Sequence, residues 1–219
     1  GATYGQVAKL TAADAAAGDN FGWTVAIDGN TVVVGAVYKD GKTGAAYVFR
    51  TSDGGATYGQ VAKLTAADAA SGDYFGSSVA IDGDTVVIGA NSPPPSSGSA
   101  YVFRTTNGGA TYGQVVKLTA DDGASGDYFG SSVAIDGDTV AIRGDGSVYI
   151  FRTTDDGGTW SQVAKLVTSD GVSISSVAIS GDVVVAGASS DDSIASNAGA
   201  VYIFLTTDGG ATYAQVAKL

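Results

Sequence analysis

The 219-residue sequence lacks four amino-acid types altogether: histidine, cysteine, methionine and glutamate. Without cysteine no disulfide can form, so cysteine usage gives no indication of the redox compartment. Without histidine, cysteine and glutamate, most of the usual general bases and activated nucleophiles are absent. No unit of the sequence carries an acidic pair that sets it apart from the others. We therefore expect that the chain is not an enzyme.

Basic residues and long apolar runs are also scarce. The 11 basic residues face 22 acidic ones, all aspartate, and the net charge of -11 repels nucleic acid and anionic membrane surfaces. No apolar run approaches the ~20 residues of a membrane-spanning helix, and we recognise no signal peptide. The missing initiator methionine indicates a processed chain or a fragment, which is compatible with secretion. The sequence thus predicts no nucleic-acid partner and no membrane span.

What the sequence has in abundance is repetition. Five copies of "YGQVAKL" or a close variant recur every 48–54 residues, and periods of about 50 residues are typical of solenoids, propellers or arrays. The copies begin at Tyr4, Tyr58, Tyr112, Trp160 and Tyr213. We divide a single repeat domain, 1-219, into units 1-54, 55-108, 109-157 and 158-209, followed by a closing or donated strand, 210-219.

Each unit has the pattern of four short strands. In the second unit these are "QVAKL", "SSVAIDG", "DTVVIGA" and "SAYVFR", rich in Val, Ile, Tyr and Phe, with Gly, Asp and Ser between them. Asp82-Gly83 lies between two of these strands, which is a strong hairpin signal. Four antiparallel strands per unit, arranged radially, are typical of a β-propeller. We predict an all-β, β-propeller-type repeat with four blades of four antiparallel strands, plus one extra outer strand.

One stretch of the second unit resembles a known repeat. "GDYFGSSVAIDGDTVVIGA" (Gly72–Ala90), followed by "GSAYVFR", is similar to the FG-GAP repeat, the unit of the integrin alpha-subunit β-propeller and of many secreted repeat proteins. The resemblance covers essentially the whole chain and implies a β-propeller outside the cell or at its surface. Two units depart from the pattern: Ile174-Ser175 replaces Phe-Gly in the fourth, and Arg143-Gly144 replaces Gly-Ala in the third.

A second motif, "TSDGGATY", resembles the Asp box of bacterial neuraminidases. An Asp or Asn side chain that accepts local backbone N–H bonds, with glycine beside it, makes a stable hairpin tip, so we predict a structural role for these turns. Three arginines occupy equivalent places next to the boxes, which also indicates a repeated structural role. The box residues are Asp53, Asn107, Asp155 and Asp208, and the arginines are Arg50, Arg104 and Arg152.

Paired aspartates precede each of the three Phe-Gly motifs. Carboxylate oxygens suit Ca²⁺, but the calcium loop of integrin-type propellers is not carried over, because the corresponding connection is a short Asp-Gly turn. The alternative is capping and Asx-turn chemistry in a solvated loop, which we favour because a full ligand set is not visible. The candidate calcium ligands are Asp14, Asp19, Asp68, Asp73, Asp122 and Asp127.

Two loops carry short motifs of other kinds. "NSPPPSSGS" (Asn91–Ser99) favours extended polyproline structure, and Ser92, Ser96 and Ser97 are candidates for O-glycosylation. "RGD" at Arg143–Asp145 falls on a tight hairpin, where cell-adhesion receptors read such a tripeptide. The same residues are ordinary turn composition, and we take that as their explanation.

The repeated motif "YGQVAKL" occurs five times, but only four blades are predicted. The FG-GAP resemblance implies that this strand is outermost and completes the blade begun in the preceding unit, so one copy, Tyr4–Leu10 or Tyr213–Leu219, is left over. A spare strand marks a cut in a longer array, lies along an edge of its own fold, or joins a sheet in another chain. The near identity of the two ends favours the third reading. Its inter-chain strand residues would be Tyr4, Gln6, Val7, Leu10, Tyr213, Gln215, Val216 and Leu219.

We therefore predict an extracellular or cell-surface structural or adhesive β-propeller that associates with itself through its terminal strands and can extend into filaments. The alternative is a lectin-like, carbohydrate-binding propeller, with or without Ca²⁺, in which Trp23, Tyr74 and Tyr128 stack on sugars. Its partners would be glycans or cell-surface proteins. The third and least supported hypothesis is a neuraminidase-type glycosidase.

Overall fold

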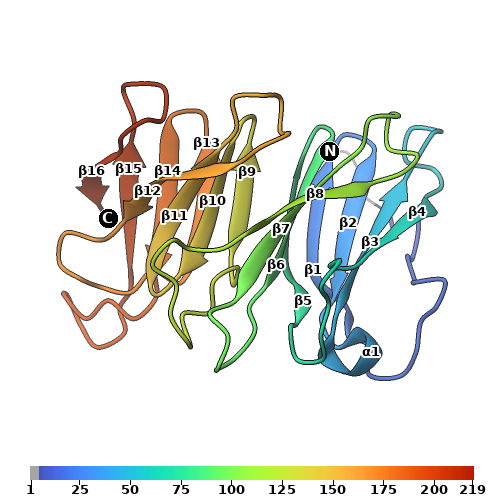
Figure 1. Ribbon diagram of the computed structural model, residues 1–219, viewed down its shortest axis with the longest axis horizontal. Coiled ribbons are helices and arrows are strands. Elements are labelled where there is room, and N and C mark those ends of the chain that lie inside the picture. Colours follow the sequence, from blue (N-terminus) through green and yellow to red (C-terminus); the bar gives the residue numbers. More distant parts are fainter. Residues whose placement is uncertain (1–4) are drawn as a thin grey trace.

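A computed structural model describes residues 5–219, which form four antiparallel sheets of four strands each. Figure 1 shows the four sheets side by side in a row, with the first (blue) and the fourth (red) at opposite ends. Every strand pairs with its neighbour in the chain, so each sheet is an up-and-down blade. This arrangement confirms the predicted all-β propeller fold.

The bounds of the strands repeat from blade to blade. The first blade contains β1 (Phe21–Asp28), β2 (Thr31–Ala36), β3 (Ala45–Arg50) and β4 (Gly59–Leu64). The second contains β5 (Phe75–Asp82), β6 (Thr85–Ala90), β7 (Ser99–Arg104) and β8 (Gly113–Leu118). The third contains β9 (Val133–Asp136), β10 (Thr139–Gly144), β11 (Ser147–Arg152) and β12 (Ser161–Leu166). The fourth contains β13 (Ser176–Ser180), β14 (Val183–Ala188), β15 (Ala200–Leu205) and β16 (Ala214–Lys218).

One short helical element, α1 (Lys39–Lys42), connects β2 to β3. Asp40 and Gly41 within it have left-handed backbone angles, so it is a tight turn rather than a regular helix. Among the residues that the structure describes, no helix has the length and apolar character needed to cross a membrane.

The outer strand of each blade comes from the following sequence unit. β4 pairs with β3, and β16 completes the fourth blade in the same way, with Ala217 opposite Ile203. The N-terminal copy of the repeated motif is therefore the one that completes no blade of its own chain. Its residues 5–10 belong to no strand, and Tyr4 lies outside the described residues.

Three hydrophobic cores each lie between two consecutive blades. One face of a blade, the leading face, carries its large aromatic side chains, and the other, the trailing face, carries smaller Val and Ala side chains. Val33 and Val48 on the trailing face of the first blade pack against Phe75 and Tyr101 on the leading face of the second. Phe75 and Tyr101 have ring centroids 5.4 Å apart. Full burial of each such side chain contributes about 1.5–3 kcal/mol to stability.

The two halves of the FG-GAP motif meet across this boundary. Gly76, which follows Phe75, lies directly against Gly35 of the preceding blade. A Cβ on Gly76 would lie 2.6 Å from the carbonyl oxygen of Ala45 and 3.3 Å from the Cα of Gly35. Backbones that pack this closely leave no space for a side chain, which explains why both motifs contain glycine.

The two departures from the motif meet each other at one boundary, between the third and fourth blades. Arg143 stands where the earlier blades have glycine, and its Nε donates to the carbonyl oxygen of Ile174, at 3.0 Å. Its Nη1 donates to Ser131 Oγ, also at 3.0 Å. Ile174 fills the buried place of the missing phenylalanine. The Arg-Gly-Asp sequence leads into the tight β10–β11 hairpin, as expected, with Asp145 exposed in the turn, but Arg143 lies in β10, half-buried and bonded.

The row of blades does not close into a ring. Val25 and Ile27 on the leading face of the first blade are 68% and 66% exposed, whereas the equivalent Val79 and Ile81 pack into a core. At the other end, Leu219 is 75% exposed, although the equivalent Leu64 is only 3% exposed. The chain is thus an open arc of four blades with one uncovered face at each end.

Candidate functional sites at the blade ends and in an aromatic groove

The N-terminal segment lies on the leading face of the first blade. Leu10 and Ala12 pack against the core that contains Tyr47 and Phe49. In the second blade, the corresponding contacts come from Leu64 and Ala66, which continue from the outer strand of the preceding blade. Leu10 and Ala12 therefore take the places that Leu64 and Ala66 hold in the second blade.

The trailing face of the fourth blade contains a hollow of about 470 Å³, lined in part by Gly187, Ala188 and Leu219. At the first two internal boundaries, the equivalent Gly-Ala site holds the Phe-Gly motif of the next blade. A Cβ on Gly187 would meet only the side chain of Ser176, so this Gly-Ala site is open. The first blade presents Gly22 with open space beside it, so the motif at each end of the row has no neighbouring blade against it among the described residues.

Polar bonds reinforce the internal junctions but are altered in the fourth blade. Asp28 Oδ2 accepts a bond from the Gly83 N–H, at 2.8 Å, and Asp82 and Asp136 make the same bond to the next blade. Arg50 donates to the carbonyl oxygen of Gly108 in the following hairpin, as Arg152 does to Gly209. The fourth blade has Ser180 in place of the aspartate and Leu205 in place of the arginine. Its exposed face is consequently more apolar than the internal ones.

The Asp boxes form hairpin tips, as the motif predicts. Asp53 Oδ1 accepts bonds from the Thr57 N–H, at 2.9 Å, and from the Thr51 hydroxyl, at 2.8 Å. The bond that Asp53 accepts from the Thr57 hydroxyl is the main cause that lowers its pKa below the ordinary range. Asn107, Asp155 and Asp208 make equivalent bonds. These residues hold local turns, which is a structural role.

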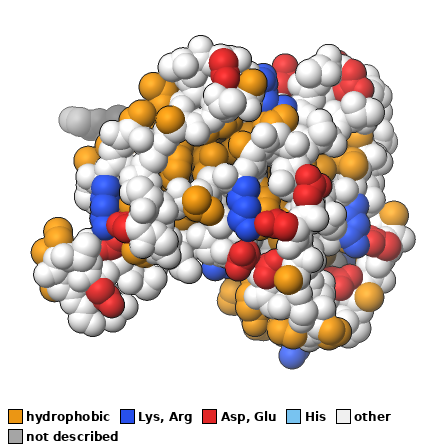
Figure 2. All heavy atoms as spheres, turned by 60° about the vertical axis from the view of Figure 1, so that its left-hand side comes forward, with side chains coloured by type: hydrophobic (Ala, Val, Ile, Leu, Met, Phe, Trp, Pro, Cys, Tyr) orange, Lys and Arg blue, Asp and Glu red, His pale blue; other side chains and the backbone are white. Residues whose placement is uncertain are grey.

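The candidate calcium ligands bond to lysines, tyrosine hydroxyls and backbone N–H groups. Asp14 Oδ2 lies 2.7 Å from Lys63 Nζ, and its Oδ1 accepts a bond from the Tyr47 hydroxyl, also at 2.7 Å. The Lys63 bond is the main cause that lowers the pKa of Asp14 to about 2. Asp19 Oδ2 accepts a bond from Lys39 Nζ, at 3.0 Å. Figure 2 shows such lysine–aspartate pairs recurring across the surface.

The other four candidate ligands have similar partners. Asp68 pairs with Lys117 and Asp122 with Lys165, while Asp73 and Asp127 each accept a backbone N–H bond within their own loop. Within residues 5–219, no group of three or more acidic side chains is arranged to hold a metal. Calcium binding by these loops stays a prediction.

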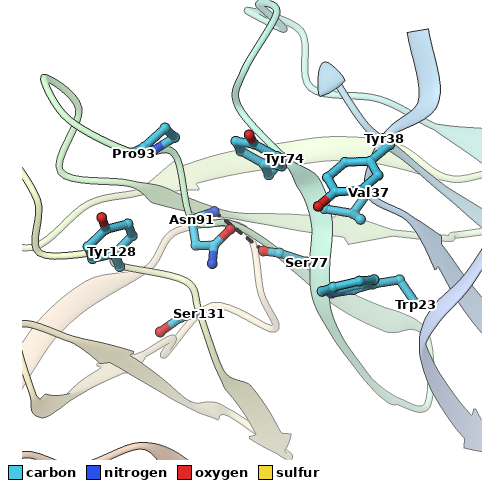
Figure 3. A pocket seen from close by; sticks show the side chains of 9 residues that line it. All are labelled: Trp23, Val37, Tyr38, Tyr74, Ser77, Asn91, Pro93, Tyr128 and Ser131. Carbon is cyan, nitrogen blue, oxygen red and sulfur yellow. Dashed lines mark hydrogen bonds between the residues drawn. The ribbon is translucent and has the colours of Figure 1, made fainter. Parts of the chain in front are cut away.

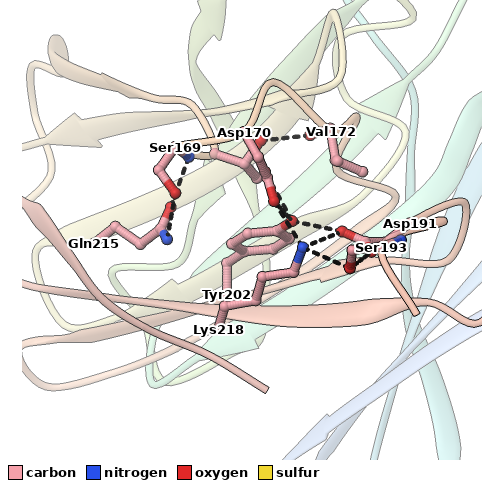
Figure 4. Close-up of polar contacts among 9 residues, drawn as sticks. Ser169, Asp170, Val172, Asp191, Ser193, Tyr202, Gln215 and Lys218 are labelled. Carbon is pink, nitrogen blue, oxygen red and sulfur yellow. Dashed lines mark hydrogen bonds and ion pairs between the residues drawn. The ribbon is translucent and has the colours of Figure 1, made fainter.

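The fourth blade has an enlarged form of the same cluster, drawn in Figure 4. Lys218 Nζ lies 2.7 Å from Asp170 Oδ2 and 2.7 Å from Asp191 Oδ2, and Asp191 is only 1% exposed. The Tyr202 hydroxyl lies 2.7 Å from Asp191 Oδ2. Burial raises the pKa of Tyr202 to about 12, and the Lys218 bond lowers that of Asp170 to about 2. The Asp–Lys pair, with the lysine near a tyrosine ring, recurs in all four blades, and the tyrosine hydroxyl bonds the aspartate in the first, second and fourth. The repeat pattern alone did not predict this cluster.

The proline- and serine-rich loop corrects one expectation. Ser92 is buried, and its hydroxyl donates to the carbonyl oxygen of Asp73, at 3.3 Å. A buried hydroxyl cannot accept a sugar in the folded protein, so Ser92 is not an O-glycosylation site there. Ser96 and Ser97 are half-buried, and their glycosylation stays a prediction.

An aromatic groove of about 460 Å³ crosses the first three blades. Figure 3 shows Trp23 and Tyr128 on opposite sides of the hollow, with Ser77 and Asn91 between them. Tyr38 and Tyr74 also line it, and their ring centroids are 5.8 Å apart. Trp23 is 54% exposed, which is unusual for the largest apolar side chain. The groove unites the three aromatic residues that the sequence analysis associated with sugar stacking.

These repeated blades and junctions define a β-propeller repeat protein. The FG-GAP repeat model matches residues 4–49, 58–103, 112–151 and 160–204, so the chain belongs to the FG-GAP repeat family. No curated protein matches the chain.

Solved structures share this fold at low sequence identity. A protein from Lactobacillus plantarum matches with a TM-score of 0.59 at 14% identity, over 90% of this chain and 55% of that one. A protein from Bacteroides uniformis, described as a candidate 6-phosphogluconolactonase, matches with a TM-score of 0.61 at 15% identity, over 90% and 56%. The periplasmic gluconolactonase of Pseudomonas aeruginosa matches with a TM-score of 0.63 at 14% identity, over 89% and 56%. The chain thus spans about half the length of these proteins.

These matches correct the expectation that the chain is not an enzyme. Two of the three structures carry lactonase names, so this fold includes proteins named as enzymes. The missing histidine, cysteine and glutamate exclude particular mechanisms, and they do not exclude the whole class. At 14–15% identity the likeness concerns the fold alone.

Proposed function

We propose that the chain is a structural or adhesive propeller module, outside the cell or at its surface, that associates end to end with further copies of itself. The observation that carries this proposal is the match between its two exposed faces. The fourth blade has an open Gly-Ala site at Gly187-Ala188, and the first blade has an unoccupied Phe21-Gly22. Joining them would repeat the junction that already occurs inside the chain. The extracellular location rests on the likeness to secreted repeat proteins.

The terminal strands explain how such a junction would form. Residues 6–10 and 215–219 have the same sequence, QVAKL; residues 215–218 lie in the outer strand β16, and Leu10 packs on the first blade as Leu64 does on the second. Only one of them can occupy that edge once two copies meet. The incoming segment would replace β16 in its pairing with β15. The chain of the second copy would then lead directly into its own first blade, just as the chain after β4 leads into the second blade. Main-chain hydrogen bonds would then connect the two copies.

Engineered cysteines test this pairing directly, because the chain has none of its own. Ala217 lies opposite Ile203, so Ala8 of a second copy would take that place after strand exchange. We expect Ala8→Cys combined with Ile203→Cys to form disulfide-linked oligomers on a non-reducing gel. The matched control, Ala217→Cys with Ile203→Cys, should give a disulfide within one chain. Failure of the first pair to link copies would contradict strand exchange.

Two proline variants distinguish the roles of the two identical segments. Val7 is 74% exposed and belongs to no strand, so Val7→Pro should leave the melting temperature unchanged but prevent pairing with another sheet. Val216→Pro interrupts β16 and should lower the melting temperature. Sedimentation velocity over a concentration series measures the association. Oligomers that persist in Val7→Pro, or a wild-type chain that is monomeric throughout, would refute the proposal.

A further inference from the structure

The aromatic groove combines large exposed rings with small polar groups. Trp23, Tyr74 and Tyr128 contribute the rings, and Ser77 and Asn91 lie between them (Figure 3). We infer that the groove binds a neutral saccharide, whose apolar ring face stacks on Trp23 and Tyr128 while its hydroxyls bond to the serine and asparagine side chains. This inference does not depend on end-to-end association.

The aromatic residues of the groove are not required by the repeat. Trp23 occupies the position held by Ser77 and Ser131 in the next two blades. Conversely, the position of Tyr74 and Tyr128 is held by Asn20 in the first blade. Trp23 and Tyr74 both contact the Tyr38 ring, with centroids 5.9 Å and 5.8 Å apart. Because each position accepts a small polar residue elsewhere in the same fold, the blade junction itself does not require these rings.

Backbone geometry supports a functional reason for two of the tyrosines. Tyr74 and Tyr128 have φ angles of 57° and 53°, in the left-handed region that favours glycine and asparagine over bulky residues. Asn20, with φ 54°, shows the residue type that this backbone prefers. Unfavourable backbone positions of this kind cluster at ligand sites, where the side chain has a task.

The charge of the groove selects the class of ligand. None of its lining residues is an acid or a base, and the chain as a whole carries a net charge of -11. An anionic sugar would be repelled by this charge and would find one cation nearby, Lys42, whose Nζ lies 5.9 Å from the ring centres of Tyr38 and of Tyr74. A neutral pyranose fits this lining, because the aromatic rings contact its C–H face and the amide and hydroxyl groups form hydrogen bonds at its edge.

Fluorescence gives a direct measurement, because the chain has two tryptophans and only one lies in the groove. Trp160→Tyr places the residue found at Tyr58, Tyr112 and Tyr213 in the other units, and leaves Trp23 as the sole tryptophan. This variant would be titrated with neutral oligosaccharides of β-linked glucose, galactose, N-acetylglucosamine and xylose, and with α-linked mannose. Oligosaccharides of polygalacturonate and heparin would be titrated in parallel as anionic ligands.

We expect a saturable change in Trp23 emission with at least one neutral oligosaccharide. Calorimetry on the same sugar should show affinity weakened about tenfold or more in Trp23→Ser and in Tyr128→Asn. Both variants carry residues from the chain's own repeats and should remain folded, as circular dichroism would verify. The inference is overturned if no neutral sugar binds at millimolar concentration, if only anionic sugars bind, or if both variants bind as tightly as the wild type.

Discussion

At the scale of single residues, glycine determines how closely the blades pack. Gly89 and Gly187 occupy the same position in the second and fourth blades, but only Gly89 faces a following blade. A Cβ on Gly89 would overlap the carbonyl oxygen of Gly130, whereas at Gly187 it would meet only the flexible side chain of Ser176. Substitution by alanine therefore tests a closed blade junction at Gly89 and an open one at Gly187.

We predict that Gly89→Ala destabilises the fold by about 1–3 kcal/mol, because the two backbones must move apart. Gly187→Ala should be neutral or slightly stabilising, since alanine restricts the unfolded chain more than glycine does. Urea unfolding of both variants measures the difference in the free energy of unfolding. Equal effects of the two substitutions would show that the Gly89 contact does not limit the packing.

The two departures from the FG-GAP motif form a contact that the sequence alone does not reveal. Arg143 and Ser175 lie far apart in the chain, and each on its own looks like a loss of the motif. In the structure they belong to one boundary, where Arg143 bonds the backbone beside Ser175. Their pairing could not be predicted from spacing alone, because it depends on which faces of the two blades meet.

At the scale of elements, the Asp–Tyr–Lys clusters connect the loop before a blade to its third and outer strands. The second blade shows the arrangement well: Asp68 bonds Lys117 Nζ, at 2.5 Å, and the Tyr101 hydroxyl, at 2.9 Å. Lys117 Nζ also lies 5.4 Å from the centre of the Tyr101 ring. Each cluster holds its loop against the blade and makes stability depend on pH.

The expected pH dependence has an acid and an alkaline limb. The pKa of Asp14 and of Asp170 is about 2 in the folded chain, against an ordinary value of 3.8. The unfolded chain therefore binds more protons as pH falls from about 4 to 2, and the stability from these carboxylates is lost in that window. Burial raises the pKa of Tyr101 and Tyr202 from 10.0 to about 12, so stability also declines as pH rises above about 10.

Melting temperatures measured across the pH range check this expectation. We predict a plateau between about pH 5 and 9 with a fall on either side. Asp170→Asn removes one paired carboxylate, so it should lower the plateau and make the acid limb shallower. An acid limb that is unchanged in this variant would show that other groups control it.

The strands were largely predictable from the sequence, as were three aromatic residues of the groove, while the clusters and the shape of the groove were not. Alternating Val, Ile and Tyr between Asp-Gly turns indicates hairpins without knowledge of the tertiary structure, and the repeat fixes their number. The groove depends on Trp23 and Tyr38, where the first unit departs from the others, and on loops whose course the repeat does not determine. The repeated Asp, Tyr and Lys were visible as a pattern, but their contacts require the folded chain.

At the scale of the whole molecule, the open arc answers a question that the sequence left undecided. A small closed ring, a ring shared by two chains and an open array were all compatible with four units. The exposed Val25, Ile27 and Leu219 exclude the closed four-bladed ring for this structure. The sequence could not decide this, because equal repeats fit rings of different size through small changes in the angle between blades.

Net charge gives a prediction at the same scale. Two copies that each carry a charge of -11 repel one another, while the faces that would join are apolar. Added salt screens the repulsion, so end-to-end association should strengthen between about 10 mM and 150 mM sodium chloride. Sedimentation equilibrium at each salt concentration gives the association constant. Weakening with salt would instead indicate contacts made by opposite charges.

The succession of cores between neighbouring blades has a mechanical consequence. Force applied between the first and the fourth blade passes through three junctions in series, each with a core of its own. Such a chain of contacts yields at its weakest link while the rest hold, as in other linear arrays of repeats. The molecule can therefore lengthen in steps under load without losing every blade at once, a behaviour compatible with the proposed structural or adhesive role.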